Sequence, residues 1–139
     1  MNCSVTGVMI ADAHMYLEVM LREFSLSSLA QIEKKVKCTS SFSHLISNLC
    51  YPTLWEKGFE ISDSRLWISV GYHPRLATEF ESYHYSEMNE LLKKERVVGF
   101  GEVGLDYMNP EASWGVQRVV LRTIVPLAVI HGYTLQGEV

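Results

Sequence analysis

Short apolar runs alternate with segments of helical spacing along the whole chain. The apolar runs predict strands, which we place at Val5–Ala11, Ser43–Asn48, Leu66–Gly71, Val97–Glu102 and Thr134–Gln136. Helical spacing predicts helices, which we place at Ser28–Val36, Thr53–Phe59, Tyr85–Glu95 and Ser113–Ile130. Residues 15–27 are interpreted as a loop or a short helix.

Strands and helices therefore take turns, and the better-defined strands are mostly apolar rather than alternating. This pattern is typical of a parallel α/β sheet whose two faces are covered. The pattern alone leaves open whether the sheet is a doubly wound layer or an arc of a barrel.

Length and composition indicate one folded domain. With 139 residues, 47% of them hydrophobic, the chain can form one core but not two, and its net charge of -4 gives no general attraction for nucleic acid. The N-terminus lacks the features of a secretory signal, and we expect no membrane span. Three widely spaced cysteines without a metal-ligand pattern indicate a reducing compartment, cytoplasmic or nuclear.

Polar clusters follow three of the predicted strands directly. They are Asp12-Ala13-His14, Tyr72–Arg75 and Glu102–Asp106. Because parallel strands end on one face, we expect these clusters to converge there. Imidazole and carboxylate groups suit a divalent metal ion that activates water. Glu102 is the most informative, since a carboxylate that closes an apolar strand needs a partner or a metal.

The segment Gly99–Gly104 also fits the pattern G-x-G-x-x-G, which occurs in nucleotide-binding loops. A dinucleotide site wants an acidic residue about 20 positions further on, and none lies between Glu111 and Glu138. A kinase loop wants a downstream lysine, and none follows Lys94. We therefore reject both interpretations.

Three segments in the same order resemble the motifs of TatD-type deoxyribonucleases. Asp12–Glu18 (DAHMYLE) is similar to their D-x-H-x-H-L-D motif, Gly71–Pro74 (GYHP) to their G-x-HP segment, and Gly101–Tyr107 (GEVGLDY) to their GE-x-GLD-Y signature. Asn48–Pro52 is most similar to an animal branch of the family. The resemblance covers about residues 8–136.

This resemblance implies a TIM-type barrel and a metal-dependent hydrolase that cleaves phosphodiester bonds in DNA, usually with two divalent ions (Mg, Mn or Zn). By position, His14 and Glu102 are the candidate metal ligands, and Glu102 is also the candidate catalytic residue. The residues expected to contact substrate or to support the ligands are Asp12, His73, Arg75 and Asp106. Arg75 could hold a phosphate.

The sequence departs from the family pattern in two ways that bear on activity. Tyr16 stands where the first motif has its second His, and a neutral phenol is a poor ligand for these metals. The chain also stops at Val139, just before the next metal-binding His of the family. We therefore expect residues 1–139 to form a single truncated domain, a partial barrel of about four parallel strands with covering helices. Its edges would be open to self-association, and its activity weak or absent.

Two alternatives remain open. The chain could be an inactive remnant that acts only by binding, or an amidohydrolase-like enzyme acting on a small molecule. The second is favoured by the lack of a basic stripe, because Lys34, Lys35 and Lys37 are expected to form a solvated helix face.

Overall fold

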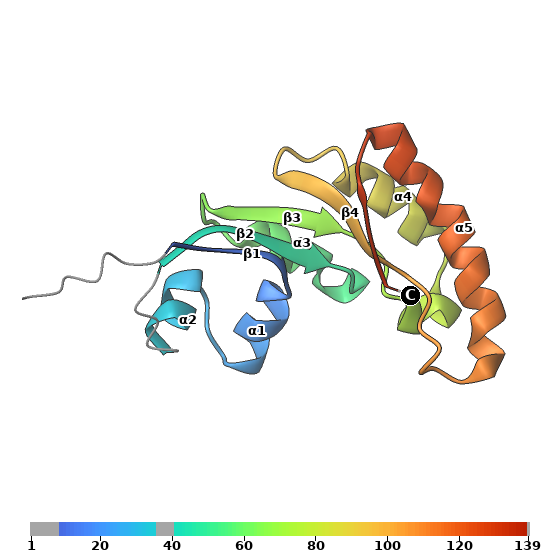
Figure 1. Ribbon diagram of the computed structural model, residues 1–139, viewed down its shortest axis with the longest axis horizontal. Coiled ribbons are helices and arrows are strands. Elements are labelled where there is room, and N and C mark those ends of the chain that lie inside the picture. Colours follow the sequence, from blue (N-terminus) through green and yellow to red (C-terminus); the bar gives the residue numbers. More distant parts are fainter. Residues whose placement is uncertain (1–8, 36–40, 139) are drawn as a thin grey trace, which may run out of the picture.

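The computed structural model describes residues 9–35 and 41–138 (Figure 1). The strands are β1 (Met9–Met15), β2 (Ser41–Leu49), β3 (Leu66–Val70), β4 (Val97–Gly104) and β5 (Leu135–Glu138). The α-helices are α1 (Leu17–Glu23), α2 (Leu29–Lys35), α3 (Trp55–Glu60), α4 (Ser82–Leu91) and α5 (Trp114–His131). Short 3-10 helices are η1 (Pro52–Leu54), η2 (Pro74–Glu79) and η3 (Glu111–Ser113).

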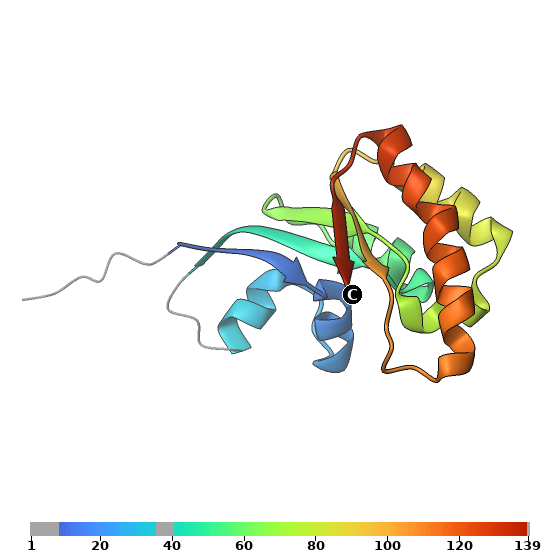
Figure 2. The same cartoon turned by 45° about the vertical axis from the view of Figure 1, so that its right-hand side comes forward.

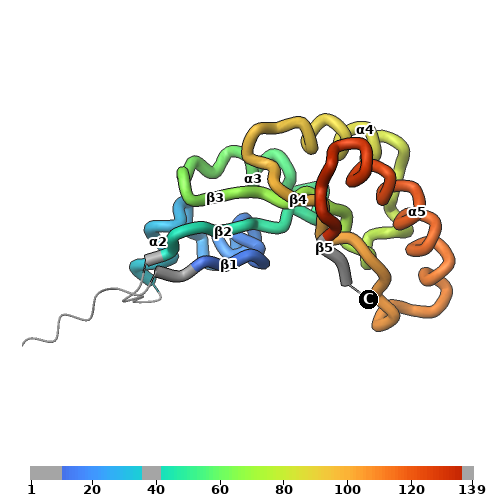
Figure 3. Tube along the Cα trace, turned by 45° about the horizontal axis from the view of Figure 1, so that its top comes forward, coloured from blue at the N-terminus to red at the C-terminus, as the bar shows by residue number. Residues whose placement is uncertain are grey.

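All five strands form one parallel sheet in the order β1-β2-β3-β4-β5. A doubly wound sheet reverses its strand order at a switch point, and this order never reverses. The sheet instead curls into an arc, as the Cα trace shows (Figure 3). The fold is therefore the predicted partial barrel, and its short fifth strand β5 overlaps the strand predicted at Thr134–Gln136.

Two strands at the site, β1 and β4, extend further toward their carboxyl ends than the sequence predicted. β1 runs through Asp12 and His14 to Met15, and β4 runs through Glu102 to Gly104. These polar residues therefore lie within the ends of their strands instead of following them. An inward-facing polar side chain leaves the backbone ladder intact, so polarity alone does not mark the end of a strand. The predicted part at residues 5–8 lies outside the described residues.

Helices cover the convex face of the sheet in two groups (Figures 1 and 2). The helices α1 and α2 pack beneath β1 and β2, where Leu17, Leu29 and Leu45 are almost fully buried in one cluster. The helices α4 and α5 pack at the other end, and Met88 and Leu127 lie there with Phe100 of β4 in a larger cluster. Burial of these apolar side chains holds the arc together.

Helix α4 begins three residues earlier than Tyr85, where the helical spacing begins. Its first turn is closed by a capping box, in which the Glu81 backbone N–H donates to Nδ1 of His84 at 3.0 Å. A His at this position is not the usual Glu or Gln, so the sequence pattern did not reveal the cap.

The concave face of the arc carries no helix in the described part of the chain. Ala13, Ile46, Ser69 and Leu135 line a shallow open concavity there of about 290 Å³. The expectation that both faces of the strands are covered is therefore wrong at this concavity, where Ala13, Val98 and Leu135 are exposed.

Helix α5, with the 3-10 turn before it, is long and apolar enough to cross a membrane by length and composition alone. A helix of the core of a folded domain passes the same test. Val120, Ile124, Leu127 and Ala128 of the helix are buried in the larger core cluster. The apolar character of this side of the helix is thus explained by core packing.

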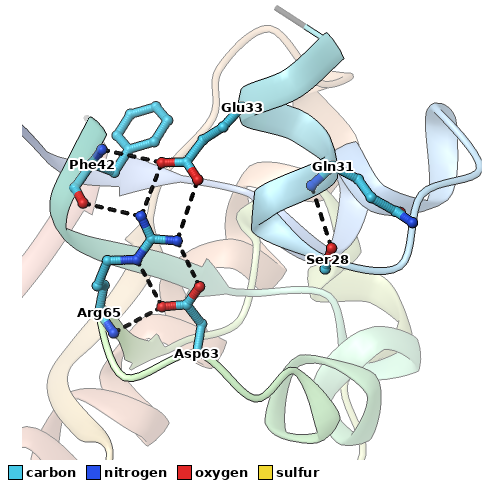
Figure 4. A network of polar contacts seen from close by, with 6 residues as sticks. All are labelled: Ser28, Gln31, Glu33, Phe42, Asp63 and Arg65. Carbon is cyan, nitrogen blue, oxygen red and sulfur yellow. Dashed lines mark hydrogen bonds and ion pairs between the residues drawn. The ribbon is translucent and has the colours of Figure 1, made fainter. Parts of the chain in front are cut away.

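A network of partly buried ion pairs and hydrogen bonds joins α2 to the starts of β2 and β3 (Figure 4). Arg65 donates to both carboxylate oxygens of Asp63, at 3.0 and 2.8 Å, and to Glu33 at 2.9 Å. It also donates to the carbonyl oxygen of Phe42 at 3.2 Å. At the start of α2, the Ser28 hydroxyl accepts from the Gln31 N–H at 3.3 Å. Lys34 and Lys35 are exposed, as predicted, and Lys37 lies outside the described residues.

Candidate active site

Glu102, near the end of β4, is the centre of the site. Its side chain is only 1% exposed. Its Oε2 accepts a hydrogen bond from the Tyr16 hydroxyl and lies 3.5 Å from Nε2 of His14. Its Oε1 is buried without a partner among the described residues. A buried carboxylate oxygen of this kind costs free energy unless a ligand satisfies it.

His14 and Asp12 reach the site from β1. The Asp12 carboxylate accepts from the His14 backbone N–H at 2.9 Å, which fixes the local backbone where β1 shifts register against β2. The His14 ring meets the Tyr16 ring edge-on, with Nε2 3.3 Å from the phenol oxygen. The half-exposed His14 ring is therefore accessible from the open side while it faces Glu102.

Aromatic rings extend the site away from Glu102 along the carboxyl ends of the strands, which form the rim of the arc. Tyr51, which follows β2, lies 6.3 Å from Tyr16 between ring centroids and stacks on His73 at 5.2 Å, with only 16° between the ring planes. His73 is buried, and its Nδ1 accepts from the Arg75 N–H at 3.2 Å. His73 therefore connects to the Glu102 site through Tyr51 and Tyr16.

Arg75 and Asp106 form an ion pair beside this rim, with Arg75 Nε 2.7 Å from Asp106 Oδ2. This contact holds the pKa of Asp106 below its usual value. The buried Gln117 side chain fixes the backbone of Asp106, accepting from its N–H at 2.7 Å and donating to its carbonyl at 3.0 Å. The exposed guanidinium thus has a fixed anchor next to the site.

Gly71 allows β3 to approach the Glu102 backbone closely. A Cβ atom at this position would lie 2.3 Å from the Glu102 carbonyl oxygen and from the Gly101 carbonyl carbon. Contacts this short are sterically forbidden, so only glycine fits here.

The structure thus brings His14 and Glu102 into direct range, and it places Asp12 behind His14. His73 lies further along the rim, and Arg75 and Asp106 form a separate pair. The roles assigned to these residues stay predictions. The sequence did not single out Tyr51 or the buried amide of Asn48, although both lie in the segment 48–52 noted for its resemblance.

The chemistry of these groups fits a divalent ion. An unpaired carboxylate oxygen and an imidazole nitrogen are ordinary ligands for Mn and Zn. The described residues contain no group of three or more His, Cys, Asp and Glu side chains placed to hold a metal. His14 and Glu102 therefore supply part of a coordination shell.

An arc of a parallel β/α barrel with polar groups at the carboxyl ends of its strands defines the class, that of TIM-barrel-type enzymes. The family model described as TatD related DNase matches residues 11–136, and the chain belongs to this family.

Two known proteins are similar to this chain. The human protein named 3'-5' RNA nuclease TATDN2 is 27% identical over 104 residues, which cover 69% of this chain and 13% of that protein. The crystal structure of YjjV, a TatD homologue from Escherichia coli K12, superposes with a TM-score of 0.78 and 14% identity, covering 92% of this chain and 49% of that one. The chain thus spans about half of the solved homologue and a smaller part of the human relative.

Proposed function

We propose that this chain supplies the Glu102 and His14 part of the active site of a metal-dependent hydrolase that cleaves phosphodiester bonds in DNA. The buried Glu102 carboxylate carries the proposal: its Oε1 has no partner among the described residues, and its Oε2 lies 3.5 Å from Nε2 of His14. A bound Mg, Mn or Zn ion would supply a nucleophilic water and stabilise charge on the phosphate. Glu102 and His14 hold the ion, and Arg75 binds a neighbouring phosphate.

Whether the substrate is DNA or RNA is tested by comparing cleavage of the two. Family membership favours DNA, whereas the printed name of the human relative points to RNA. The chain's net charge of -4 favours neither, because binding depends on local groups and ions. End-labelled single strands of DNA and RNA with one base sequence, assayed side by side with Mn, measure the preference.

The test of activity uses the full chain and the isosteric variant Glu102→Gln. The parent is expected to release nucleotides only slowly in Mg or Mn, because His14 and Glu102 supply part of a coordination shell, and to stop when the metal is chelated. Glu102→Gln should lower the rate by about 100-fold or more, since several kcal/mol of charge stabilisation depends on the bound ion. Equal cleavage by parent and variant would show that the activity comes from elsewhere.

A second candidate function is binding without cleavage. It is favoured by Tyr16, whose hydroxyl occupies the Glu102 oxygen that faces His14. In this case the chain would bind single-stranded nucleic acid, and Mn would neither tighten binding nor produce cleavage. Binding and cleavage measured on the same labelled strand separate the two functions.

We also propose that the outer strands mediate self-association. Within the described residues, β1 and β5 each have one neighbour in the sheet, and unpaired strand edges favour pairing between chains. Sedimentation velocity at increasing protein concentration should show a dimer or larger species. A monomer across the whole range would contradict this.

A further inference from the structure

The side chain of Asn48 lies on the concave face of β2. Its neighbours Ser47 and Leu49 both point to the convex face, where Ser47 Oγ donates to Glu18 Oε2 and Leu49 packs in the larger core cluster. Successive residues of a strand point to opposite faces. Asn48 therefore shares the concave face with Ile46, which lines the open concavity.

The Asn48 amide has no partner in the described structure. The residue is 0% exposed, and both Oδ1 and Nδ2 are buried without a hydrogen bond to any described residue. A buried amide that makes no hydrogen bond destabilises the fold. Such a group in a folded protein indicates a ligand or an ordered water that the amide contacts.

The side chains that reach Glu102 from β1 pass over Asn48. The hydrogen bond from Tyr16 and the approach of His14 join β1 to β4, so these side chains span the concave faces of β2 and β3. Directly after β3, Gly71 contributes no side chain, and a Cβ atom there would collide with the Glu102 backbone. Asn48 pairs in register with Ser69, whose hydroxyl donates to the Gly101 carbonyl at 2.8 Å. Asn48 is therefore the inward-facing side chain of β2 nearest to its end, beneath the Glu102 site.

We propose that Asn48 belongs to the Glu102 site and that its amide oxygen is a further ligand of the divalent ion held there. The inference rests on the proposed function and adds Asn48 as a third metal ligand beside Glu102 and His14. Carboxylate and amide oxygens together suit Mg and Mn. Two buried oxygens without partners among the described residues, Glu102 Oε1 and Asn48 Oδ1, would then be satisfied by one ion.

The experiment measures Mn²⁺ affinity and the thermal midpoint of the metal-free full chain. In Asn48→Leu we expect Mn²⁺ affinity to fall by about tenfold or more. The metal-free midpoint should stay equal or rise, because the substitution removes an unpaired polar group. The matched control is Ile46→Leu, on the same face of the same strand, which should leave Mn²⁺ affinity unchanged.

Asn48→Asp supplies a second, independent signature. A carboxylate beside Glu102 should lower the metal-free midpoint through like-charge repulsion, and saturating Mn²⁺ should restore it. Its Mn²⁺ affinity should exceed that of the parent. A structural role for the amide predicts no such metal-dependent recovery.

Three outcomes would overturn the inference. If Asn48→Leu binds Mn²⁺ like the parent while Glu102→Gln does not, Asn48 is outside the site and the proposed function stands. If Asn48→Leu lowers the metal-free midpoint together with the affinity, the amide is structural. If the parent itself binds no Mn²⁺, the proposed metal site and this inference fail together.

Discussion

The Tyr16 hydroxyl donates a hydrogen bond to Oε2 of Glu102, the same oxygen that lies 3.5 Å from the His14 imidazole. Burial, followed by this hydrogen bond, raises the pKa of Tyr16 well above its ordinary value of about 10. The phenol is therefore neutral at physiological pH and competes with a metal ion for the carboxylate oxygen.

Tyr16→His should strengthen metal binding, because an imidazole replaces the phenol as a second nitrogen ligand. We expect Mn²⁺ affinity to rise by about tenfold or more, which corresponds to about 1.4 kcal/mol. Isothermal calorimetry measures the affinity directly.

Tyr16→Phe is the matched control for this substitution, since it removes the hydroxyl and adds no ligand. Its affinity should lie between those of the parent and Tyr16→His. An affinity in Tyr16→His no better than in Tyr16→Phe would show that position 16 does not face the ion.

Gly71→Ala tests the close approach of β3 to the Glu102 backbone. The added methyl group would force the backbones apart, because its nearest atoms would be only 2.3 Å away. Overpacking of this kind costs about 1–3 kcal/mol, so urea denaturation should show a lower unfolding free energy. Mn²⁺ affinity should fall as well, because Glu102 moves.

The control for this position is Gly99→Ala on β4, where an added Cβ would meet nothing closer than 3.5 Å. Its stability should stay close to that of the parent. Equal unfolding free energies for Gly71→Ala and Gly99→Ala would mean that the backbone at Gly71 can move without loss of stability.

The sequence predicted the sheet and the importance of Glu102 because both follow from strong local patterns. A carboxylate at the end of an apolar strand needs a partner, and Glu102 is buried with one oxygen that has no partner among the described residues. The parallel sheet followed from the alternation of elements, whereas the strand order, which distinguishes an arc from a doubly wound layer, needed the structure.

The contribution of β2 to the site was not predictable in the same way. When both faces of a strand are expected to be buried, the alternation of side chains does not say which residues face inward. Asn48 and Ser47 look equivalent in sequence, yet only Ser47 hydrogen-bonds to Glu18 on the convex side. The contact of Tyr51 with His73 depends on the pairing of β2 with β3, which brings together residues 22 positions apart.

Arg65→Gln should lower the unfolding free energy by about 1–2 kcal/mol at neutral pH, since it breaks the ion pairs to Asp63 and Glu33. The hydrogen bond from Arg65 is the largest cause that lowers the pKa of Asp63. A lowered pKa in the folded state gives stability that is present above the unfolded value of about 3.9 and lost as pH falls through the folded value. The difference between parent and variant should therefore shrink in acid.

The control for Arg65 is Lys93→Gln, which removes an exposed ion pair with Glu90. Exposed pairs contribute about 0–1 kcal/mol, so this variant should unfold almost like the parent. Denaturant titrations at several pH values compare both. A difference for Arg65→Gln that persists unchanged below the folded pKa of Asp63 would contradict the assignment to this carboxylate.

Glu18→Gln should stabilise the protein at neutral pH. Glu18 is 4% exposed, its Oε1 has no partner among the described residues, and burial raises its pKa. A raised folded pKa gives stability that is fully present below the unfolded value of about 4.3 and lost as pH rises through the folded value. The neutral amide avoids this loss and can still accept from Ser47, so the gain above that range should be on the order of 1 kcal/mol.

Glu23→Gln, on the exposed side of the same helix, is the control and should show little change at any pH. Unfolding free energies of Glu18→Gln and the parent should converge below about pH 4. A variant less stable than the parent at pH 7 would show that the Glu18 carboxylate is stabilised by a contact that the amide cannot replace.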